Sequence, residues 1–394
     1  MNISSTIILL LWILPGFTAG QASDVLDQKP VKVAAERIEF YFPLLEEKRI
    51  GIVANQTSLV GNAHLVDTLF ISGFEVLKVF GPEHGFRGNA SDGEKVDDGR
   101  DPKTGLPVIS LYGSHRKPTA DDLKGLDLVI FDIQDVGTRF YTYISTMTYV
   151  MEACAENDIP VMILDRPNPN GNFVDGPVLD TAFSSFVGLH PVPVVHGMTV
   201  GEYAQMVNGE GWLKNGIQCE LTVIPVENYD HTMLYDLPVA PSPNLPNMTA
   251  IYLYPSLCFF EGTIISVGRG TDLPFQVIGH PDFAYGSFAF TPGSIPGVSV
   301  HPPYEGETCF GQSLQGYSEL VLKERRLHLD LLISYYDYFK DKEPFFKPYF
   351  TKLAGSEQLQ KQIESGMTEG EIRATWQTEL EKFMAIRAKY LLYN

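Results

Sequence analysis

The sequence predicts an α/β protein with a parallel sheet in its N-terminal domain and a smaller α+β domain at its C-terminal end. Two features predict this fold class. Between Arg49 and Val226, short apolar strands alternate with helical patterns, and beyond that point the chain becomes rich in Gly, Pro and aromatic residues. A length of 394 residues suits two domains. We expect the first domain to span residues 27–244 and the second to span residues 245–394.

The N-terminal domain is predicted from runs of Val, Ile, Leu and Phe that alternate with segments of helical spacing. Strands of a parallel sheet are covered on both faces, so they are apolar along their whole length. We expect strands at 49–56, 74–80, 106–112, 126–133, 159–165 and 219–226, and helices at 64–72, 120–126, 143–158 and 199–213. No G-x-G-x-x-G follows the first strand and no G-x-x-x-x-G-K-[ST] loop occurs, so the motifs that usually bind nucleotides are missing.

The C-terminal domain is predicted to begin after a Pro-rich connection at residues 238–247. Residues 262–281 have the pattern of strand and turn, and residues 282–316 that of irregular β structure. Helical spacing then returns at 317–339, 356–366 and 378–392. This order of elements indicates an α+β domain.

The N-terminus has the pattern of a secretory signal peptide over residues 1–22. An apolar core from Ile7 to Leu14 is followed by Pro-Gly and by the small residues Ala19, Gly20 and Ala22. The alternative is an uncleaved anchor, but the apolar run is short for a membrane span. We therefore expect a secreted, periplasmic protein with no membrane span in the mature chain.

The net charge limits the class of partner, and the cysteine pattern indicates the state of the thiols. The net charge of −19 goes against a nucleic-acid partner, which needs clustered Lys and Arg. The four cysteines, which contain no C-x-x-C pair, are Cys154, Cys219, Cys258 and Cys309. Export permits disulfides, but Cys154 lies in a helical pattern and Cys258 in an apolar run, so we favour buried free thiols.

Polar side chains gather directly after the predicted strands. Ligands of open parallel sheets bind outside the carboxyl ends of the strands, so these side chains are candidates for substrate binding. Individually, each also has a structural interpretation: Asp135 can cap a helix, and Asp165 with Arg166 can form an ion pair. The candidates are Asn55, Glu83, His84, Arg87, Asp132, Gln134, Asp135, Arg139, Asp165, Arg166 and Asn168, together with His196 further along the chain.

Two acids are the candidates for catalysis. Glu83 lies in the Gly-rich segment "GPEHGFRG", and Glu261 follows Phe259 and Phe260. Apolar surroundings disfavour the charged form of a carboxyl group, which suits a general acid. Two carboxylates across a cleft predict glycoside hydrolysis by acid/base catalysis. Tyr141, with Tyr143, Phe259 and Phe260, offers either stacking faces for a sugar or core packing.

Other classes of function have weaker support. A metal-dependent hydrolase would use His84, Asp132, Asp135, Asp165 and His196, but no H-x-H or H-E-x-x-H spacing occurs. No G-x-S-x-G elbow indicates a serine hydrolase. We therefore expect no metal and no other cofactor. A non-catalytic periplasmic sugar-binding protein, which also has two α/β lobes, stays open.

Several long segments of the chain resemble the exo-β-N-acetylmuramidases of the NamZ type, formerly an uncharacterised family. They are "GPEHGFRG", "FDIQDVGTRFYTYISTM", "LDRPNPNG", "VDGPVLD", "HGMTVGEYA", "SPNLP" and "YPSLCFFEGTIISVGRGTDLPF". The resemblance implies a Rossmann-like domain, a smaller C-terminal domain and an active-site cleft between them. It also implies release of N-acetylmuramic acid from the non-reducing end of peptidoglycan fragments. Glu83 is then the principal catalytic acid and Glu261 the second carboxylate.

The substrate that this resemblance implies carries a carboxylate on its lactyl ether, which N-acetylglucosamine lacks. Guanidinium groups grip carboxylates through two parallel hydrogen bonds. Arg269 is our first candidate, because Gly268 and Gly270 beside it allow close approach of a ligand. Arg139 and Arg87 are the others. The alternative is that Arg269 pairs with Asp272 or another nearby acid.

Overall fold

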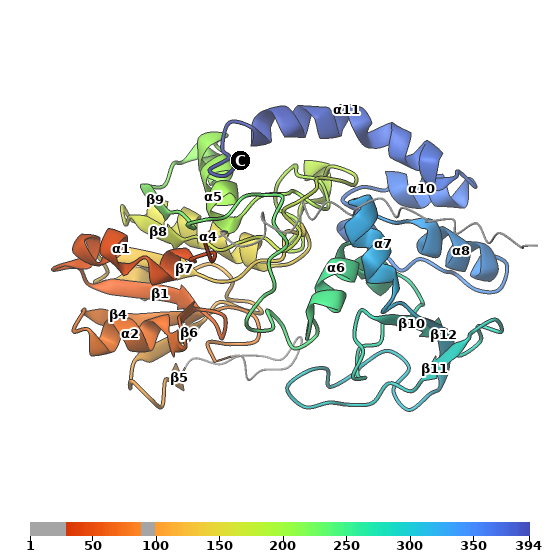
Figure 1. Cartoon of the computed structure of the whole chain (residues 1–394), viewed down its shortest axis with the longest axis horizontal. Helices are drawn as coiled ribbons and strands as arrows, with labels where there is room; N and C mark the ends of the chain where they lie inside the picture. Colours follow the sequence, from red (N-terminus) through yellow and green to blue (C-terminus); the bar gives the residue numbers. More distant parts are fainter. Residues whose placement is uncertain (1–28, 88–98) are drawn as a thin grey trace, which may run out of the picture.

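The computed structural model describes residues 29–87 and 99–394 and contains the two expected kinds of domain (Figure 1). The N-terminal sheet has the strand order β5-β6-β4-β1-β7-β8-β9. Six strands are parallel and β5 is antiparallel, so the parallel strands follow the 3-2-1-4-5-6 order of Rossmann folds. The strands are β1 (Ile50–Ala54), β4 (Val76–Gly81), β5 (Gly99–Arg100), β6 (Pro107–Ser110), β7 (Leu128–Asp132), β8 (Val161–Leu164) and β9 (Leu221–Ile224).

Alternating side chains of each central strand enter two different cores. In β1, Ile50 and Ile52 pack in one cluster with residues of α1 and α2, whereas Val53 packs in the other with residues of α4 and α5. Every residue of β1 and β7 is buried, as the continuous apolar runs predicted. The helices of this domain are α1 (Ile38–Leu45), α2 (Leu65–Ile71), α3 (Ala120–Leu123), α4 (Tyr143–Ala155) and α5 (Val200–Gly209).

The C-terminal domain consists of a three-stranded antiparallel sheet and six helices within the described residues. Its sheet contains β10 (Val277–His280), β12 (Cys309–Ser313) and β11 (Phe288–Phe290), in that order. The predicted helical segment 317–339 is two helices, because Arg325 adopts a left-handed conformation with φ 50° and ends the first. The helices are α6 (Met248–Leu257), α7 (Tyr317–Glu324), α8 (Asp330–Phe339), α9 (Phe350–Ala354), α10 (Gln358–Glu364) and α11 (Glu369–Arg387).

Short elements complete the described part of the chain. A two-stranded hairpin of β2 (Leu59–Val60) and β3 (Ala63–His64) follows β1. The 3-10 helices are η1 (Ala34–Glu36), η2 (Thr181–Phe183), η3 (Lys214–Gly216) and η4 (Cys258–Gly262). The last of these directly extends α6 and carries Glu261.

Helix α11 brings the C-terminal end of the chain back to the N-terminal domain, beside α5 and β9 (Figure 1). Its last residue, Arg387, donates through Nε to the carbonyl oxygen of Gly197 at 3.1 Å. Beyond the helix, the Tyr393 hydroxyl donates to Oδ2 of Asp165 at 2.6 Å and accepts from the backbone N–H of Val226 at 2.8 Å. The chain terminus is therefore part of the N-terminal core.

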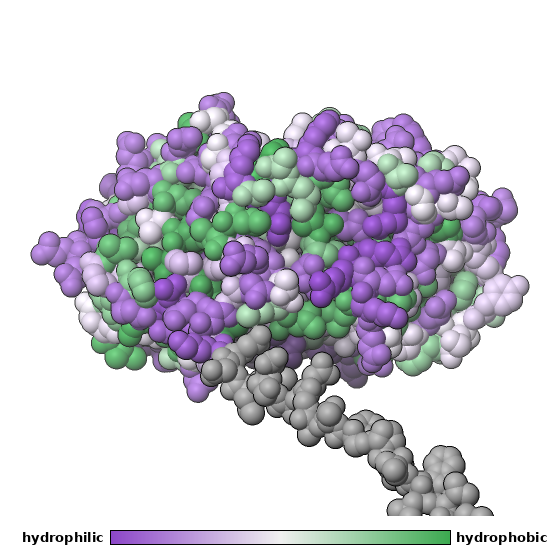
Figure 2. All heavy atoms as spheres, turned by 45° about the horizontal axis from the view of Figure 1, so that its top comes forward, coloured by the Kyte–Doolittle hydropathy of each residue, from purple (hydrophilic) through white to green (hydrophobic). Residues whose placement is uncertain are grey.

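All four cysteines are buried free thiols, which confirms the prediction. The predicted signal peptide lies outside the described residues. Within the residues that the structure describes, no helix is both long and apolar enough to cross a membrane. Hydrophilic side chains cover much of the face in Figure 2, with apolar side chains in patches between them.

Candidate active site

A cavity of about 490 Å³ lies between the two domains, at the carboxyl ends of three parallel strands. From the N-terminal domain it is lined mainly by residues that follow β4, β6 and β7, which is where ligands of such sheets bind, and by residues 185–187 of the long segment after β8. The C-terminal domain closes the other side. The lining includes Glu83, His84, Tyr112, Arg116, Phe140, Tyr141, Thr142, Tyr143, Phe186, Ser242, Asn244, Tyr254, Cys258, Glu261, Arg269, Phe275, Tyr349 and Lys352.

Gly81 and Gly85 of "GPEHGFRG" build the tight turn that presents Glu83 to this cavity. A Cβ atom on Gly81 would lie 3.0 Å from the backbone nitrogen of Phe86, so a side chain there would force the turn to shift by a few tenths of an ångström. Gly85 has φ 78°, and its N–H donates to the carbonyl oxygen of Pro82 at 2.9 Å. His84 has φ 68°, a conformation that is uncommon for a residue with a side chain and typical of functional sites.

The carboxylate of Glu83 is held at the start of helix α4. Thr142, the residue that precedes the helix, donates a hydrogen bond from Oγ1 to Oε2 of Glu83 at 3.1 Å. The Tyr143 hydroxyl lies 3.5 Å from the backbone oxygen of Glu83. The loop after β7 therefore positions the acid that follows β4.

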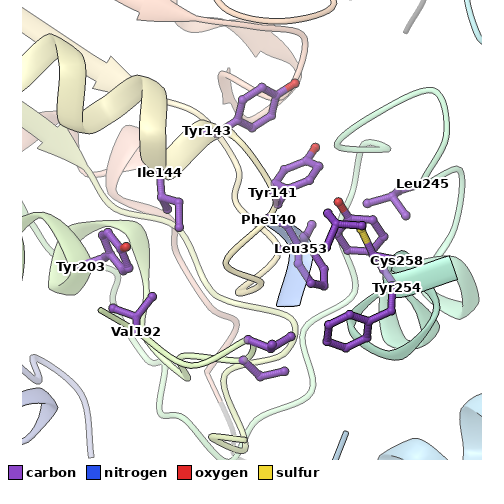
Figure 3. Packing of buried hydrophobic residues seen from close by; sticks show 14 of the residues in the cluster. Phe140, Tyr141, Tyr143, Ile144, Val192, Tyr203, Leu245, Tyr254, Cys258 and Leu353 are labelled. Atoms are coloured by element: carbon purple, nitrogen blue, oxygen red, sulfur yellow. The ribbon is translucent and has the colours of Figure 1, made fainter. Parts of the chain in front are cut away.

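The Pro-rich connection forms a further wall of the cavity. The hydroxyls of Tyr141 and Tyr143 both point to one side (Figure 3) and donate to the carbonyl oxygen of Pro241, at 2.9 and 3.4 Å. Ser242 Oγ lies 3.4 Å from Nε2 of His84. Tyr141 and His84 thus line the cavity as predicted, and they also attach this connection to the N-terminal domain.

Glu261 faces the cavity from the C-terminal domain, but not in the apolar surroundings that the sequence predicted. Phe259 and Phe260 are buried in the core. Glu261 instead accepts from Nε of Arg269 at 2.5 Å through Oε1, and Oε2 lies 3.6 Å from the Cys258 thiol. The argument for a general acid at this position assumed contact with Phe259 and Phe260, whereas the carboxylate contacts a guanidinium group. Arg269 lines the cavity and pairs with a nearby acid, which is Glu261 rather than Asp272.

Two of the three arginines predicted to bind a carboxylate lie away from the cavity. Arg87 forms ion pairs with Asp67 at 3.1 Å and Asp101 at 2.8 Å, and so fixes the loop after β4 to the sheet edge. Arg139 is fully buried and donates to the carbonyl oxygens of Pro177, Val192 and Leu353 at 2.7 to 2.9 Å. The bond to Leu353 ties the N-terminal domain to α9.

The predicted polar residues after β8 also form structure rather than the wall of the cavity. Arg166 binds Asp132 through two hydrogen bonds of 2.6 and 2.9 Å, so this buried pair joins the ends of β7 and β8. Asp165 accepts from Thr199, from the N–H of Gly201 and from Tyr393. Asn168 donates to the carbonyl oxygen of Met198.

The remaining candidates are buried beneath the site. Asn55 Oδ1 caps its own turn by accepting from Thr57. Gln134 donates to the carbonyl oxygens of Asp135 and Pro167. Burial raises the pKa of Asp135 to about 7 and lowers the pKa of His196 to about 3. Nε2 of His196 lies 3.8 Å from Oδ2 of Asp135, and neither residue lines the cavity.

Several cavity residues were not predicted as site residues, among them Arg116, Thr142, Tyr349 and Lys352. Arg116 follows β6 and thus obeys the strand-end rule, but five residues separate it from the strand. Lys352 lies in α9 and Tyr349 directly precedes it, more than 200 residues along the chain from β6. Only tertiary packing brings them to the cavity.

The described residues contain one group of three ligand atoms close enough to share a metal ion, formed by His280, Asp282 and Glu343. None of these three residues lines the cavity. The metal ligands that the sequence analysis considered, from His84 to His196, do not form such a group in the part of the chain that the structure describes.

Comparisons with known proteins agree across the chain. The family model for the N-terminal domain of the exo-β-N-acetylmuramidase NamZ matches residues 50–249, and the model for its C-terminal domain matches residues 252–393. The peptidoglycan β-N-acetylmuramidase NamZ of Bacillus subtilis (strain 168) is 40% identical over 374 residues, which cover 90% of this chain and 89% of that protein.

Two crystal structures of DUF1343 family proteins from Bacteroides fragilis have the same fold. The first is 49% identical with a TM-score of 0.85, and the match covers 93% of this chain and 99% of that one. The second is 28% identical with a TM-score of 0.76, and the match covers 92% and 99%.

Proposed function

Because the chain belongs to the NamZ family of exo-β-N-acetylmuramidases, we infer that it releases N-acetylmuramic acid from the non-reducing end of peptidoglycan fragments. The observation that supports this most directly is the cavity between the domains, which is lined by a carboxylate from each. Glycosidases need two such groups on either side of the scissile bond. A protein that only binds sugar has no need of this pair.

We propose that Glu83 protonates the glycosidic oxygen as the bond to the anomeric carbon breaks. Its side chain accepts a hydrogen bond from a neutral hydroxyl, that of Thr142, which holds Oε2 in place. A positioned proton donor of this kind contributes about 10²–10⁴-fold to the rate. Water then adds to the anomeric carbon, and the proton that it loses returns to the carboxylate of Glu83, which restores the acid and completes hydrolysis.

We propose that Glu261 supplies the second carboxylate, which stabilises the positive charge that develops at the anomeric carbon. The ion pair with Arg269 supports this role, because a guanidinium group fixes both the charge and the direction of a carboxylate. The two acids thus have different partners, a hydroxyl for Glu83 and a guanidinium for Glu261. Different surroundings suit the different tasks of acid and carboxylate.

We also propose that the enzyme acts outside the cytoplasm, in the periplasm, where peptidoglycan is found. The apolar core of Ile7–Leu14 and the small residues after it support export. Fractionation of the native host, with the N-terminus of the mature protein determined, would test this. Intact residues 1–22 on a cytoplasmic protein would contradict it.

The proposed reaction is tested with a disaccharide of N-acetylmuramic acid linked to N-acetylglucosamine and with longer peptide-free fragments. Mass spectrometry of the products should show free N-acetylmuramic acid released only from the non-reducing end. Internal cleavage of the longer fragments, or no cleavage of either substrate, would contradict the proposal.

A further inference from the structure

The cavity concentrates positive charge in a protein whose net charge is −19. Its lining contains three cationic side chains, Arg116, Arg269 and Lys352, against the two carboxylates Glu83 and Glu261. A local excess of cations in an acidic protein favours an anionic ligand. If the proposed function holds, the substrate supplies that anion as the carboxylate of its lactyl ether.

Arg269 is not the best of these three cations for the lactyl carboxylate. Its Nε already donates to Glu261 at 2.5 Å, and its guanidinium lies 5.1 Å from the ring centre of Phe275. A second carboxylate bound at the same guanidinium would face the negative charge of Glu261. Arg116 and Lys352 have no such carboxylate partner among the described residues.

Arg116 is held so that its N–H groups stay available. Its guanidinium lies 4.2 Å from the ring centre of Phe186, and the same ring is stacked with Tyr149, with the ring centres 6.2 Å apart and the planes at 7°. Stacking occupies the flat face of a guanidinium and leaves its edge free for a two-pronged bond to a carboxylate. Arg116 is exposed, so it lies at the mouth of the cavity.

Lys352 reaches the same cavity from the C-terminal domain. Its helix, α9, is fixed to the N-terminal domain by two hydrogen bonds: Arg139 donates to the carbonyl oxygen of Leu353 at 2.8 Å, and Asp180 N–H donates to that of Gly355 at 2.9 Å. The buried arginine that was expected to bind substrate thus positions the segment that carries this lysine. Lys352 is also exposed, as a ligand at the cavity mouth requires.

We propose that Arg116 and Lys352 together bind the lactyl carboxylate and so give the enzyme its preference for muramic over glucosamine residues. Arg116 supplies a planar donor from the N-terminal domain, and Lys352 a point charge from the C-terminal domain. The substrate then bridges the two domains through its carboxylate.

A comparison of two chromogenic glycosides tests this proposal. One carries N-acetylmuramic acid, and the other carries the same sugar with the lactyl carboxylate replaced by its primary amide, which has the same shape without the charge. A charge-assisted hydrogen bond changes binding by roughly 10- to 150-fold, and an exposed one changes it less. We therefore expect the kcat/KM of wild type to be about 10-fold higher on the acid glycoside than on the amide glycoside. The Arg116→Gln/Lys352→Gln double variant should process both glycosides equally.

The controls separate this inference from the proposed function. A Lys361→Gln/Lys382→Gln variant removes two exposed charges outside the cavity and should keep the wild-type preference. An Arg116→Lys/Lys352→Arg variant keeps both charges and should retain part of the preference for the acid glycoside. A double glutamine variant that still prefers the acid overturns this inference alone. A wild type that hydrolyses neither glycoside overturns the proposed function as well.

Discussion

The Nε atom of Arg269 lies 2.5 Å from Oε1 of Glu261, and both side chains face the cavity between the domains. Since Arg269 serves Glu261 and not the substrate carboxylate, its loss should misplace the second carboxylate. We expect Arg269→Gln to lower kcat/KM by about 10- to 100-fold on the acid and amide glycosides alike. A loss confined to the acid glycoside would instead assign Arg269 to substrate selection.

The hydroxyl of Thr142 should matter for catalysis and not for folding. Thr142→Val keeps the shape of the side chain but removes the 3.1 Å hydrogen bond to Glu83. A hydrogen bond of this kind contributes about 1 kcal/mol, so we expect kcat/KM to fall roughly 5- to 10-fold with little change in Tm. Thr142→Ser, which keeps the hydroxyl, should stay close to wild type. Equal activities of the valine and serine variants would contradict the proposed positioning of Glu83.

Asp135 should make the protein less stable as pH rises. Burial raises its pKa from 3.8 to about 7, so between these values the folded state holds a proton that the unfolded state has released. The free energy of unfolding then falls with pH in this window, by at most about 1.4 kcal/mol per pH unit, and levels off above the folded-state pKa.

Asp135→Asn has no proton to release, which makes it the matched variant for this effect. The free energy of unfolding should be measured with urea at pH 5, 6, 7 and 8. The difference between Asp135→Asn and wild type should shift in favour of Asp135→Asn at each step up to pH 7. Asp165, whose pKa burial raises to about 6, titrates in both proteins and cancels in the difference. A difference that does not change with pH would contradict the assignment.

The C-terminal tail should contribute to stability and not to turnover. Tyr393→Phe removes a hydroxyl that serves both Asp165 and the N–H of Val226, so the buried N–H loses its partner and Asp165 loses one of its donors. We expect a loss of about 1–3 kcal/mol in the free energy of unfolding, with kcat unchanged. The matched control is Tyr390→Phe, whose hydroxyl donates to Glu210 near the surface and should cost less. Equal losses for both variants would contradict this role of the tail.

The order and type of most elements could be predicted from sequence, because the strands of a covered parallel sheet are continuously apolar. Five of the six parallel strands lie within the predicted ranges, and β4 extends one residue beyond its range, to Gly81. Helix α6 was missed, since Pro255 lies inside it and its residues are apolar on all sides. The sequence predicts one helical segment where α7 and α8 lie, because nothing in the local pattern marks Arg325 as left-handed.

The site was predicted only in part, for a physical reason. Position after a strand places a residue at the correct edge of the sheet, but it does not say whether its side chain points into the cavity or into the core. Glu83 and His84 point into the cavity, whereas Asp132 and Arg166 pair with each other. Lys352 was missed because its place depends on packing between the domains, which local sequence does not encode.

The central claim is that Glu83 is the proton donor, and leaving-group dependence tests it most directly. Glu83→Gln keeps the shape of the side chain but has no proton to give. A sugar leaving group needs protonation, whereas nitrophenolate leaves without it, so the two substrates separate this role from others.

The measurement is kcat/KM of wild type and Glu83→Gln on the muramic acid–glucosamine disaccharide and on the nitrophenyl glycoside. Glu75→Gln, an exposed acid outside the cavity, serves as the control for folding and charge. We predict that Glu83→Gln loses about 10²–10⁴-fold on the disaccharide and much less on the nitrophenyl glycoside. A folded Glu83→Gln enzyme that cleaves the disaccharide at a rate near that of wild type would contradict the claim.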